Sequence, residues 1–230
     1  MWKKILGQMT FNHTDFKFEE LETKTIKGKR HYVTPNGNYP SITTVLSILS
    51  RDSIKKWRER VGEAEANKIS TQAARRGTNV HLMCEHYLDN KLDKKQFNPA
   101  DKETFSSIQP VLDEHIDNIV AQEIPLWSDY LGVAGRVDCI AEFNGRLSVI
   151  DFKTSRKPKK KEWIGSYFQQ ASAYCVMFEE RTKTPIDQIV IIVAVDNERP
   201  QVFVEKRDNY ILDCMDTIKQ YYQEQIDLYG

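Results

Sequence analysis

The stretch GRVDCIAEFNGRLSVIDFKTS, residues 135–155, predicts two β-strands joined by the turn Asn144-Gly145. Asn-Gly between two largely apolar runs is the strongest short-range signal for a β-hairpin. A loop of two or four residues centred on this turn places Asp138 directly opposite Asp151, whereas a three-residue loop would break that register. The hairpin therefore predicts two carboxylates facing each other across neighbouring strands.

The same register places Arg136 opposite Lys153, and residues two apart on one strand share a face. Asp138, Asp151 and Lys153 should then project from one side of the sheet. Two opposed carboxylates repel each other unless a cation lies between them, and Mg²⁺ suits one or two carboxylates plus a substrate phosphate. A bare Asp-x-Lys is more often a surface salt bridge. With its partner strand in register, it indicates metal-assisted phosphodiester hydrolysis.

The composition sets limits on the class of protein. Lys plus Arg and Asp plus Glu both number 33 among 230 residues, so any nucleic-acid binding must come from local patches. The four cysteines are far apart without a Cys-x-x-Cys, which argues against zinc or iron–sulfur sites and suits a reducing cytosol. No apolar run reaches the roughly 18 residues of a membrane span, and the first residues do not read as a signal or transit peptide.

The order of predicted elements indicates one α/β domain over residues 1–230. Residues 1–40 read as a β decoration with a hairpin, and 41–121 as a helical part with helices starting after Ser41, over 71–88 and over 101–121. Residues 122–230 read as the sheet core, with a helix over 162–179 and a strand over 189–195. We expect a central mixed sheet flanked by helices.

These motifs resemble the RecB-like branch of the PD-(D/E)xK nuclease superfamily, and within it the mitochondrial genome maintenance exonucleases and their phage relatives. The resemblance runs from about Tyr39 to the C-terminus and is most specific over residues 74–87 and 123–174. It implies a restriction-endonuclease-like core with helical additions. It also implies that the strand ending in Ile-Asp-Phe-Lys-Thr is the catalytic strand.

The resemblance assigns roles to further residues. Gly77…His81 matches a Gly-x-x-x-His helix that brings its histidine to the metal, and Glu123 matches an acidic position near it. The backbone carbonyl of Phe152 is a metal ligand in relatives. Gln170…Tyr174 matches a Gln-x-x-x-Tyr helix that orients the active site and contacts phosphate or supports the lysine. Without the resemblance these would be ordinary packing or edge residues, and Gln169 is the alternative if the register slips by one.

Basic residues near these motifs are candidates for contact with a nucleic-acid strand. Basic side chains that alternate with an aromatic ring can bind phosphates and stack a base, although a solvated charged surface is the competing interpretation. The resemblance also implies a helical arch or channel near residues 41–76 that would admit the strand. The candidates for strand contact are Trp57, Arg75, Arg76, Arg156, Lys157, Lys159, Lys160 and Lys161.

We therefore predict a Mg²⁺- or Mn²⁺-dependent DNA exonuclease. Catalysis is expected from Asp138, Asp151, Lys153, Gln170 and Tyr174, and metal binding from His81, Glu123, Asp138, Asp151 and Phe152. The resemblance implies a preference for single-stranded DNA with a free end, and 5′-phosphate products. We expect a cytoplasmic monomer, bacterial or in a phage-infected host, with replication or recombination proteins as candidate partners. Two alternatives stay open: an endonuclease of restriction or structure-specific type, and a non-cleaving DNA-binding protein.

Overall fold

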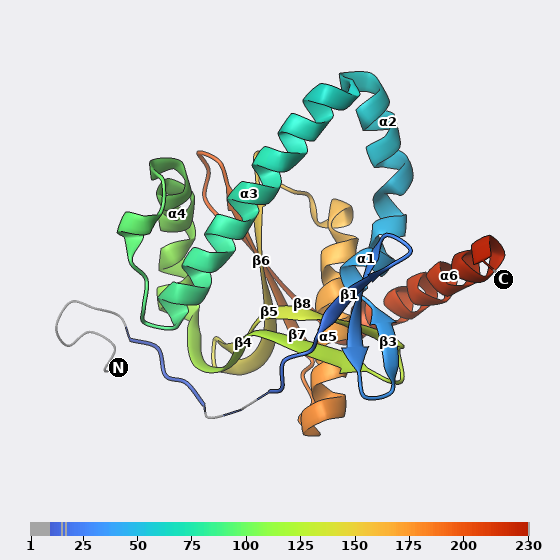
Figure 1. Ribbon diagram of the computed structural model, residues 1–230. Coiled ribbons are helices and arrows are strands. Elements are labelled where there is room, and N and C mark those ends of the chain that lie inside the picture. Colours follow the sequence, from blue (N-terminus) through green and yellow to red (C-terminus); the bar gives the residue numbers. More distant parts are fainter. Residues whose placement is uncertain (1–9, 15, 17, 230) are drawn as a thin grey trace.

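The computed structural model describes residues 10–14, 16 and 18–229 (Figure 1). The predicted decoration over residues 1–40 is therefore seen from residue 10 onward, and residues 1–9 lie outside the described part. Its strands are β1 (Thr23–Ile26), β2 (Lys29–Thr34) and β3 (Gly37–Pro40). They form an antiparallel sheet in the order β1-β2-β3, which adds one strand to the expected hairpin.

A second sheet forms the centre of the molecule, in the order β4-β5-β6-β7-β8. The parallel pair β6–β7 is connected through helix α5 (Gly165–Thr182), and the other neighbouring pairs are antiparallel, so the sheet is mixed as predicted. Its strands are β4 (Ile116–Ser128), β5 (Val133–Phe143), β6 (Arg146–Ser155), β7 (Gln188–Val195) and β8 (Gln201–Lys206).

The β5–β6 hairpin has the predicted turn and register near the turn. Asn144 and Gly145 both have positive φ, +54° and +76°, which is the backbone of the two-residue turns that match the twist of a hairpin. The ladder begins at Phe143 opposite Arg146 and runs to Cys139 opposite Ile150. Beyond that pair, β6 continues beside β7 while β5 continues beside β4. The sheet therefore forks directly before Asp138.

The predicted pairs Asp138–Asp151 and Arg136–Lys153 both lie beyond the last pair of the β5–β6 ladder, so the ladder contains neither of them. Arg136 lies opposite Pro125 of β4, and Lys153 lies opposite Val193 of β7. Strand twist separates the two hairpin strands faster than an ideal ladder assumes. The fork leaves polar backbone and side chains of both strands free to line a site.

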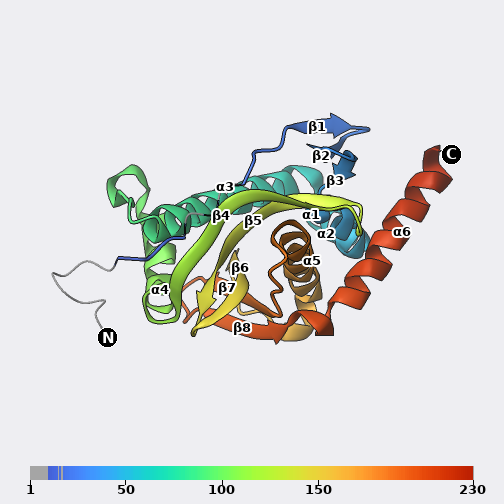
Figure 2. The same ribbon diagram turned by 90° about the horizontal axis from the view of Figure 1, so that it is seen from below.

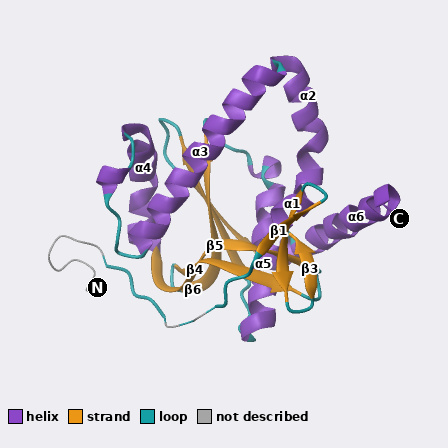
Figure 3. Ribbon diagram, in the orientation of Figure 1, coloured by secondary structure: helices purple, strands orange, loops and turns teal. Residues whose placement is uncertain are grey.

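Helices cover both faces of the central sheet (Figures 2 and 3). One face packs against α3 (Glu63–Leu88) and α4 (Pro99–His115), where Met83, Phe105 and Ile150 belong to one buried hydrophobic cluster. The other face packs against α1 (Ile42–Leu46), α5 (Gly165–Thr182) and α6 (Ile211–Tyr229). Strand β7 lies between these two layers and is buried on both faces. This explains why its sequence is apolar throughout and shows no alternation of apolar and polar residues.

Two predicted helix boundaries are wrong. The helix expected to start at 71 begins at Glu63, and the helix expected to end at 121 ends at His115, where β4 begins. Ile116 and Ile119 are both buried in β4, and their spacing fits a helix as well as an irregular strand. Pro110 lies inside α4 without ending it.

Helix α2 (Arg51–Val61) and helix α3 meet at Gly62, which has a φ of +84° that favours glycine. The two helices rise together from the body of the molecule as a V (Figure 1). This α2–α3 V occupies the region where a helical arch was expected. Within the part of the chain that the structure describes, no helix is long and apolar enough to cross a membrane.

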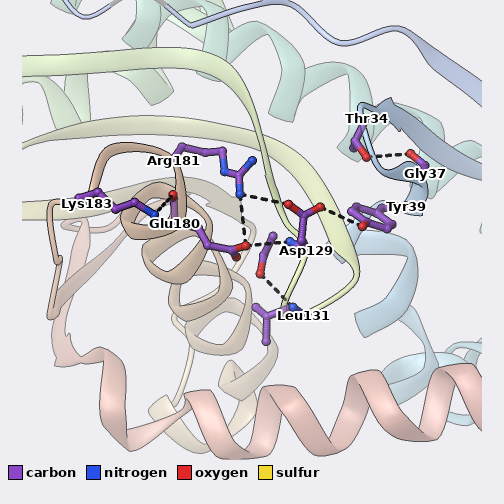
Figure 4. Close-up of polar contacts among 9 residues, drawn as sticks. Thr34, Gly37, Tyr39, Asp129, Leu131, Glu180, Arg181 and Lys183 are labelled. Atoms are coloured by element: carbon purple, nitrogen blue, oxygen red, sulfur yellow. Dashed lines mark hydrogen bonds and ion pairs between the residues drawn. The ribbon is translucent and has the colours of Figure 1, made fainter.

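A polar cluster ties the N-terminal sheet to the core (Figure 4). Asp129, after β4, accepts hydrogen bonds from the Tyr39 hydroxyl at 2.9 Å and from Arg181 of α5 at 3.2 Å. The backbone N–H of Asp129 donates to Glu180 at 3.0 Å. These bonds join β3, the β4–β5 connection and the end of α5, so the N-terminal sheet has a fixed position relative to the core.

Candidate active site

The fork between β5 and β6 places Asp138 beside the backbone of β6. Its Oδ2 accepts a hydrogen bond from the backbone N–H of Phe152 at 2.9 Å. The Asp138 side chain thus accepts from a backbone N–H of β6 that lies beyond the end of the β5–β6 ladder. This contact fixes the Asp138 carboxylate at the start of the fork.

Asp151 is buried, with 2% of its surface exposed. Its Oδ1 accepts hydrogen bonds from Lys153 Nζ at 2.7 Å and from Gln170 Nε2 at 3.2 Å. Its Oδ2 is buried without a hydrogen-bond partner in the described structure. Burial raises the pKa of Asp151 above its usual range, against the opposing effect of Lys153. An unpartnered buried carboxylate oxygen is costly unless something absent from the protein itself binds it.

Lys153 is held between Asp151 and the ring of Tyr167, whose centroid lies 5.1 Å from its Nζ. Burial works against the charge on this lysine. The carboxylates of Asp151 and Asp138 outweigh burial and leave the pKa of Lys153 above its ordinary value. The lysine is therefore a fixed positive charge beside the two carboxylates.

Three side chains bring potential metal-ligand atoms within 4.8 Å of one another: His81 of α3, Glu123 of β4 and Asp138 of β5. His81 Nδ1 lies 3.3 Å from Asp138 Oδ2. Gly77 lies one helical turn before His81 and lines the same cavity, as the Gly-x-x-x-His pattern implied. The register between β4 and β5 brings Glu123 next to Asp138, since Gln122 pairs with Cys139 and Ile124 with Val137.

Glu123 has a left-handed backbone, with a φ of +48°, which is uncommon for a non-glycine residue within a strand. Arg136 stabilises this irregularity by donating a hydrogen bond to the Glu123 carbonyl oxygen. Burial, with the neighbouring Asp138 and Glu85 carboxylates, raises the pKa of Glu123 to about 8. Such backbone strain is typical of residues that a site positions.

These donors fit a divalent cation that prefers oxygen ligands. Ligands of Mg²⁺ lie about 2.0–2.1 Å from the ion, so two opposite ligands are about 4.2 Å apart, close to the spacing found here. Asp151 is not part of the three-residue group, yet its unpartnered Oδ2 supplies one more oxygen at the fork. A cation would bind this unpartnered oxygen and would offset the burial and the carboxylate repulsion that together raise the pKa of Glu123.

Tyr174 is buried and donates a hydrogen bond to the carbonyl oxygen of Arg136 at 2.8 Å. It passes so close to Gly135 that a Cβ there would lie 2.7 Å from the tyrosine hydroxyl. This explains the glycine in Gly-Arg-Val-Asp: any side chain would displace Tyr174. Tyr174 thereby fixes the backbone of β5 at Arg136, two residues before Asp138, and also lines the cavity of the site.

A cavity of about 450 Å³ opens over these residues. His81, Glu123, Asp138, Lys153, Gln170 and Tyr174 line it, so the structure brings together the main predicted site residues. Its wall also contains residues to which the sequence analysis gave no role in the site. They are Arg30, Thr43, Thr78, Leu82 and, from the Gly-Arg-Val-Asp motif, Arg136. Arg30 and Thr43 precede the catalytic strand by more than 100 residues, and no local pattern marks them.

The predicted strand-contact residues lie outside this cavity. Trp57 is half-buried on α2 and Arg75 is exposed on α3. Arg76 forms an ion pair with Asp196 after β7 and lines a separate cavity of about 340 Å³. Its charge is therefore already paired within the protein.

The basic segment 156–161 leaves the end of β6 and is anchored by Gln201. The Gln201 side chain accepts from the backbone N–H of Lys159 at 2.7 Å and donates to its carbonyl oxygen at 2.9 Å. Lys161 is paired with Glu205 at 2.5 Å, and Lys160 lies over the exposed ring of Trp163. Arg156 and Lys157 are exposed.

Comparisons with known proteins identify the family to which this chain belongs. The family model of the PD-(D/E)XK nuclease superfamily matches residues 100–228. Mitochondrial genome maintenance exonuclease 1 of Xenopus tropicalis is 31% identical over 156 residues, 64% of this chain and 43% of that protein. The human protein of the same name is 28% identical over 130 residues, 52% of this chain and 38% of that protein. The chain thus spans less than half the length of these curated relatives.

A solved structure, described as "Putative exonuclease" from Eubacterium rectale, has a TM-score of 0.43 and 14% identity, covering 66% of this chain and 65% of that one. The family match is the stronger finding, because it extends over more than half of the 230 residues. It contains the β5–β6 hairpin and α5, which carry the carboxylates, the lysine and the glutamine of the site. The chain belongs to the PD-(D/E)XK nuclease superfamily.

Proposed function

We propose that this protein is a divalent-metal-dependent exonuclease that hydrolyses DNA from a free end and prefers single strands. The observation that carries the proposal is the fork between β5 and β6. There, His81, Glu123 and Asp138 gather potential ligand atoms beside the unpartnered oxygen of Asp151. A lysine held against the same carboxylate faces the cavity. This combination suits cleavage of a phosphodiester and explains the buried charges.

Each residue of the fork has a proposed role. His81, Glu123, Asp138 and Asp151 would hold the cation, with the Phe152 carbonyl as a further ligand. A cation held there would polarise the phosphoryl oxygen and lower the pKa of the attacking water. Lys153 would orient that water or stabilise the negative charge that develops on the phosphoryl oxygens. In-line attack would release the 3′-oxygen and leave a 5′-phosphate.

Gln170 and Tyr174 act through other groups in this proposal. The Gln170 amide donates to the same Asp151 oxygen as Lys153, which leaves the other oxygen directed to the cation. Tyr174 holds the carbonyl oxygen of Arg136 and thereby the strand that carries Asp138. Both are positioning residues, so their loss should be less severe than loss of a carboxylate or the lysine.

Attack at free ends is supported by the names of the relatives, which are exonucleases. The α2–α3 V beside the cavity would guide a flexible single strand to the fork. A restriction-type or structure-specific endonuclease could use the same fork, and a closed circle separates the two activities. A DNA-binding protein without cleavage is disfavoured because Asp138, Asp151 and Lys153 are all present, and Lys153 is bonded to Asp151.

The deciding experiment uses single-stranded oligonucleotides labelled at either end, and a closed single-stranded circle. Each is incubated with Mg²⁺, Mn²⁺ or EDTA. We expect digestion of linear strands with either metal, no reaction in EDTA and an intact circle. Asp151→Asn and Lys153→Met should each reduce the rate by at least about 100-fold. Lys219→Met, on the exposed side of α6, is the matched control and should retain activity.

Cleavage of the circle would establish an endonuclease instead, and binding without cleavage in any metal would contradict the catalytic proposal. As for its setting, we propose that the protein acts as a monomer in a bacterial or phage-infected cytoplasm. Replication or recombination proteins are its candidate partners. The curated relatives carry a mitochondrial name, which applies to those proteins.

A further inference from the structure

The cavity wall opposite the catalytic strand is made by the N-terminal sheet, through Arg30 of β2. The guanidinium Nη2 of Arg30 donates hydrogen bonds to Ser41 Oγ at 3.0 Å and to Thr43 Oγ1 at 3.2 Å. The two hydroxyls lie 2.7 Å apart. A backbone hydrogen bond from Ser41 to the Arg30 carbonyl, at 3.0 Å, fixes the two segments side by side. The position of Arg30 is therefore determined by neutral groups.

Arg30 has no ion-pair partner within the part of the chain that the structure describes. Among the carboxylates of residues 10–14, 16 and 18–229, none forms an ion pair with it. Its guanidinium carbon lies 5.6 Å from the centroid of the Tyr32 ring, which orients the group without neutralising it. Arg136, the other arginine of the cavity, is paired with Glu20 at 2.5 Å and bonded to the Glu123 carbonyl. Arg30 is thus the cavity arginine that can bind an external anion.

The chemistry of this corner suits a phosphate group. A guanidinium presents several N–H donors in a planar fork, and one nitrogen is used here, so others remain for phosphate oxygens. Thr43 is exposed and supplies a hydroxyl beside them. Lys153 and the metal-ligand group lie on the walls of the same cavity, where the scissile phosphate is expected. A second phosphate of the strand would then meet Arg30.

We propose that Arg30, with Thr43 and Ser41, forms a phosphate-binding subsite that holds the substrate strand by a phosphate next to the scissile one. This inference rests on the proposed function, because it locates a second phosphate of the same substrate. It gives the N-terminal sheet a role in binding. It also explains why the polar cluster around Asp129 fixes that sheet to the core: a phosphate contact needs a fixed distance from the catalytic fork.

The test measures binding of a fluorescent single-stranded oligonucleotide in EDTA at several salt concentrations. Arg30→Gln removes the charge but keeps an amide donor for the two hydroxyls, and Arg30→Lys keeps the charge. Lys24→Gln is the matched control, because Lys24 is exposed on β1 of the same sheet and outside the cavity. A lost phosphate contact should lower the slope of log affinity against log salt by about 0.7 for single strands.

We expect Arg30→Gln to weaken binding about tenfold and to show this smaller slope, while Arg30→Lys keeps the slope of the wild type. Lys24→Gln should leave slope and affinity unchanged. Repeating the series with and without a terminal phosphate shows whether the bound phosphate is terminal or internal. Equal slopes and affinities for Arg30→Gln and Lys24→Gln would overturn the subsite.

The two proposals fail differently. A wild-type protein that binds with an Arg30-dependent slope but never cleaves would contradict the catalytic function and keep the subsite. A protein that cleaves normally with no dependence on Arg30 would do the reverse. A wild-type protein without affinity for either linear strand or circle would overturn both.

Discussion

At the scale of single residues, the site is organised by repulsion among neighbouring carboxylates, of which Asp151 is buried and Asp138 and Glu123 are half-buried. Asp138, Asp151 and Glu123 converge from three strands, and one lysine and one amide do not satisfy all their oxygens. In the absence of a cation, a bound proton reduces this repulsion, as the raised pKa of Glu123 indicates. Removing metal should therefore make the stability of the protein depend on pH.

Glu123→Gln tests this expectation. The pKa of Glu123 is about 8 in the folded protein against 4.5 for an ordinary glutamate, so the folded state holds a proton that the unfolded state releases. Stability of the metal-free protein should then fall as pH rises from about 4.5 to 8. Glu123→Gln lacks this loss, and in EDTA at pH 9 it should melt on the order of a few degrees above the wild type.

The measurement is thermal unfolding in EDTA between pH 5 and pH 9. Glu103→Gln, an exposed carboxylate of α4, is the control and should follow the wild type. Adding Mg²⁺ or Mn²⁺ should raise the melting temperature of the wild type more than that of Glu123→Gln. If the difference in melting temperature between Glu123→Gln and the wild type does not grow as pH rises, the idea that folded Glu123 retains a proton is contradicted.

At the scale of elements, the sequence is most informative where short-range rules act. The Asn-Gly turn and its flanking strands follow from local geometry, and so does the helical spacing of Gly77 to His81 and of Gln170 to Tyr174. The boundary between α4 and β4 was missed because apolar spacing at Ile116 and Ile119 fits both structures. The fork of the sheet and the Arg30 contact depend on how distant segments pack, which periodicity does not encode.

Gly77 on α3 gives a prediction in which stability and activity change in opposite directions. A Cβ at this position would meet Thr154 Oγ1 at 3.9 Å, which is ordinary contact, so the fold does not require glycine here. Gly77→Ala should stabilise the helix by about 0.5–1 kcal/mol and raise the melting temperature. Because the residue lines the cavity, the added methyl should hinder the strand and lower kcat/KM on the order of tenfold.

Gly165→Ala is the matched control, since it is the first residue of α5 and a Cβ there has no atom within 4 Å. This variant should keep full activity. Thermal unfolding and single-strand digestion, measured on the same preparations, decide the matter. A lower melting temperature for Gly77→Ala would show that the fold requires glycine for packing. An unchanged kcat/KM would show that the substrate strand does not pass close to Gly77 of α3.

At the scale of the whole molecule, any attraction to nucleic acid would have to arise from the distribution of charge, because the formal net charge is zero. Some basic side chains on the surface are paired with carboxylates of the protein, and others are exposed. Arg76 and Lys161 are paired with Asp196 and Glu205, whereas Arg156 and Lys157 are exposed beside the end of the catalytic strand. Among the eight predicted strand contacts, Arg76 and Lys161 therefore have charges that are already paired within the protein.

The double variant Arg156→Gln, Lys157→Gln tests this distribution by salt dependence. Each phosphate contact on a single strand contributes about 0.7 to the slope of log affinity against log salt, so loss of both should reduce the slope by about 1.4. Lys24→Gln with Lys219→Gln removes the same total charge from β1 and α6 and should leave the slope unchanged. If both double variants reduce the slope equally, net charge and not the position of the charges attracts the strand. A reduced slope confined to the first would mean that the strand leaves the fork along the segment after β6.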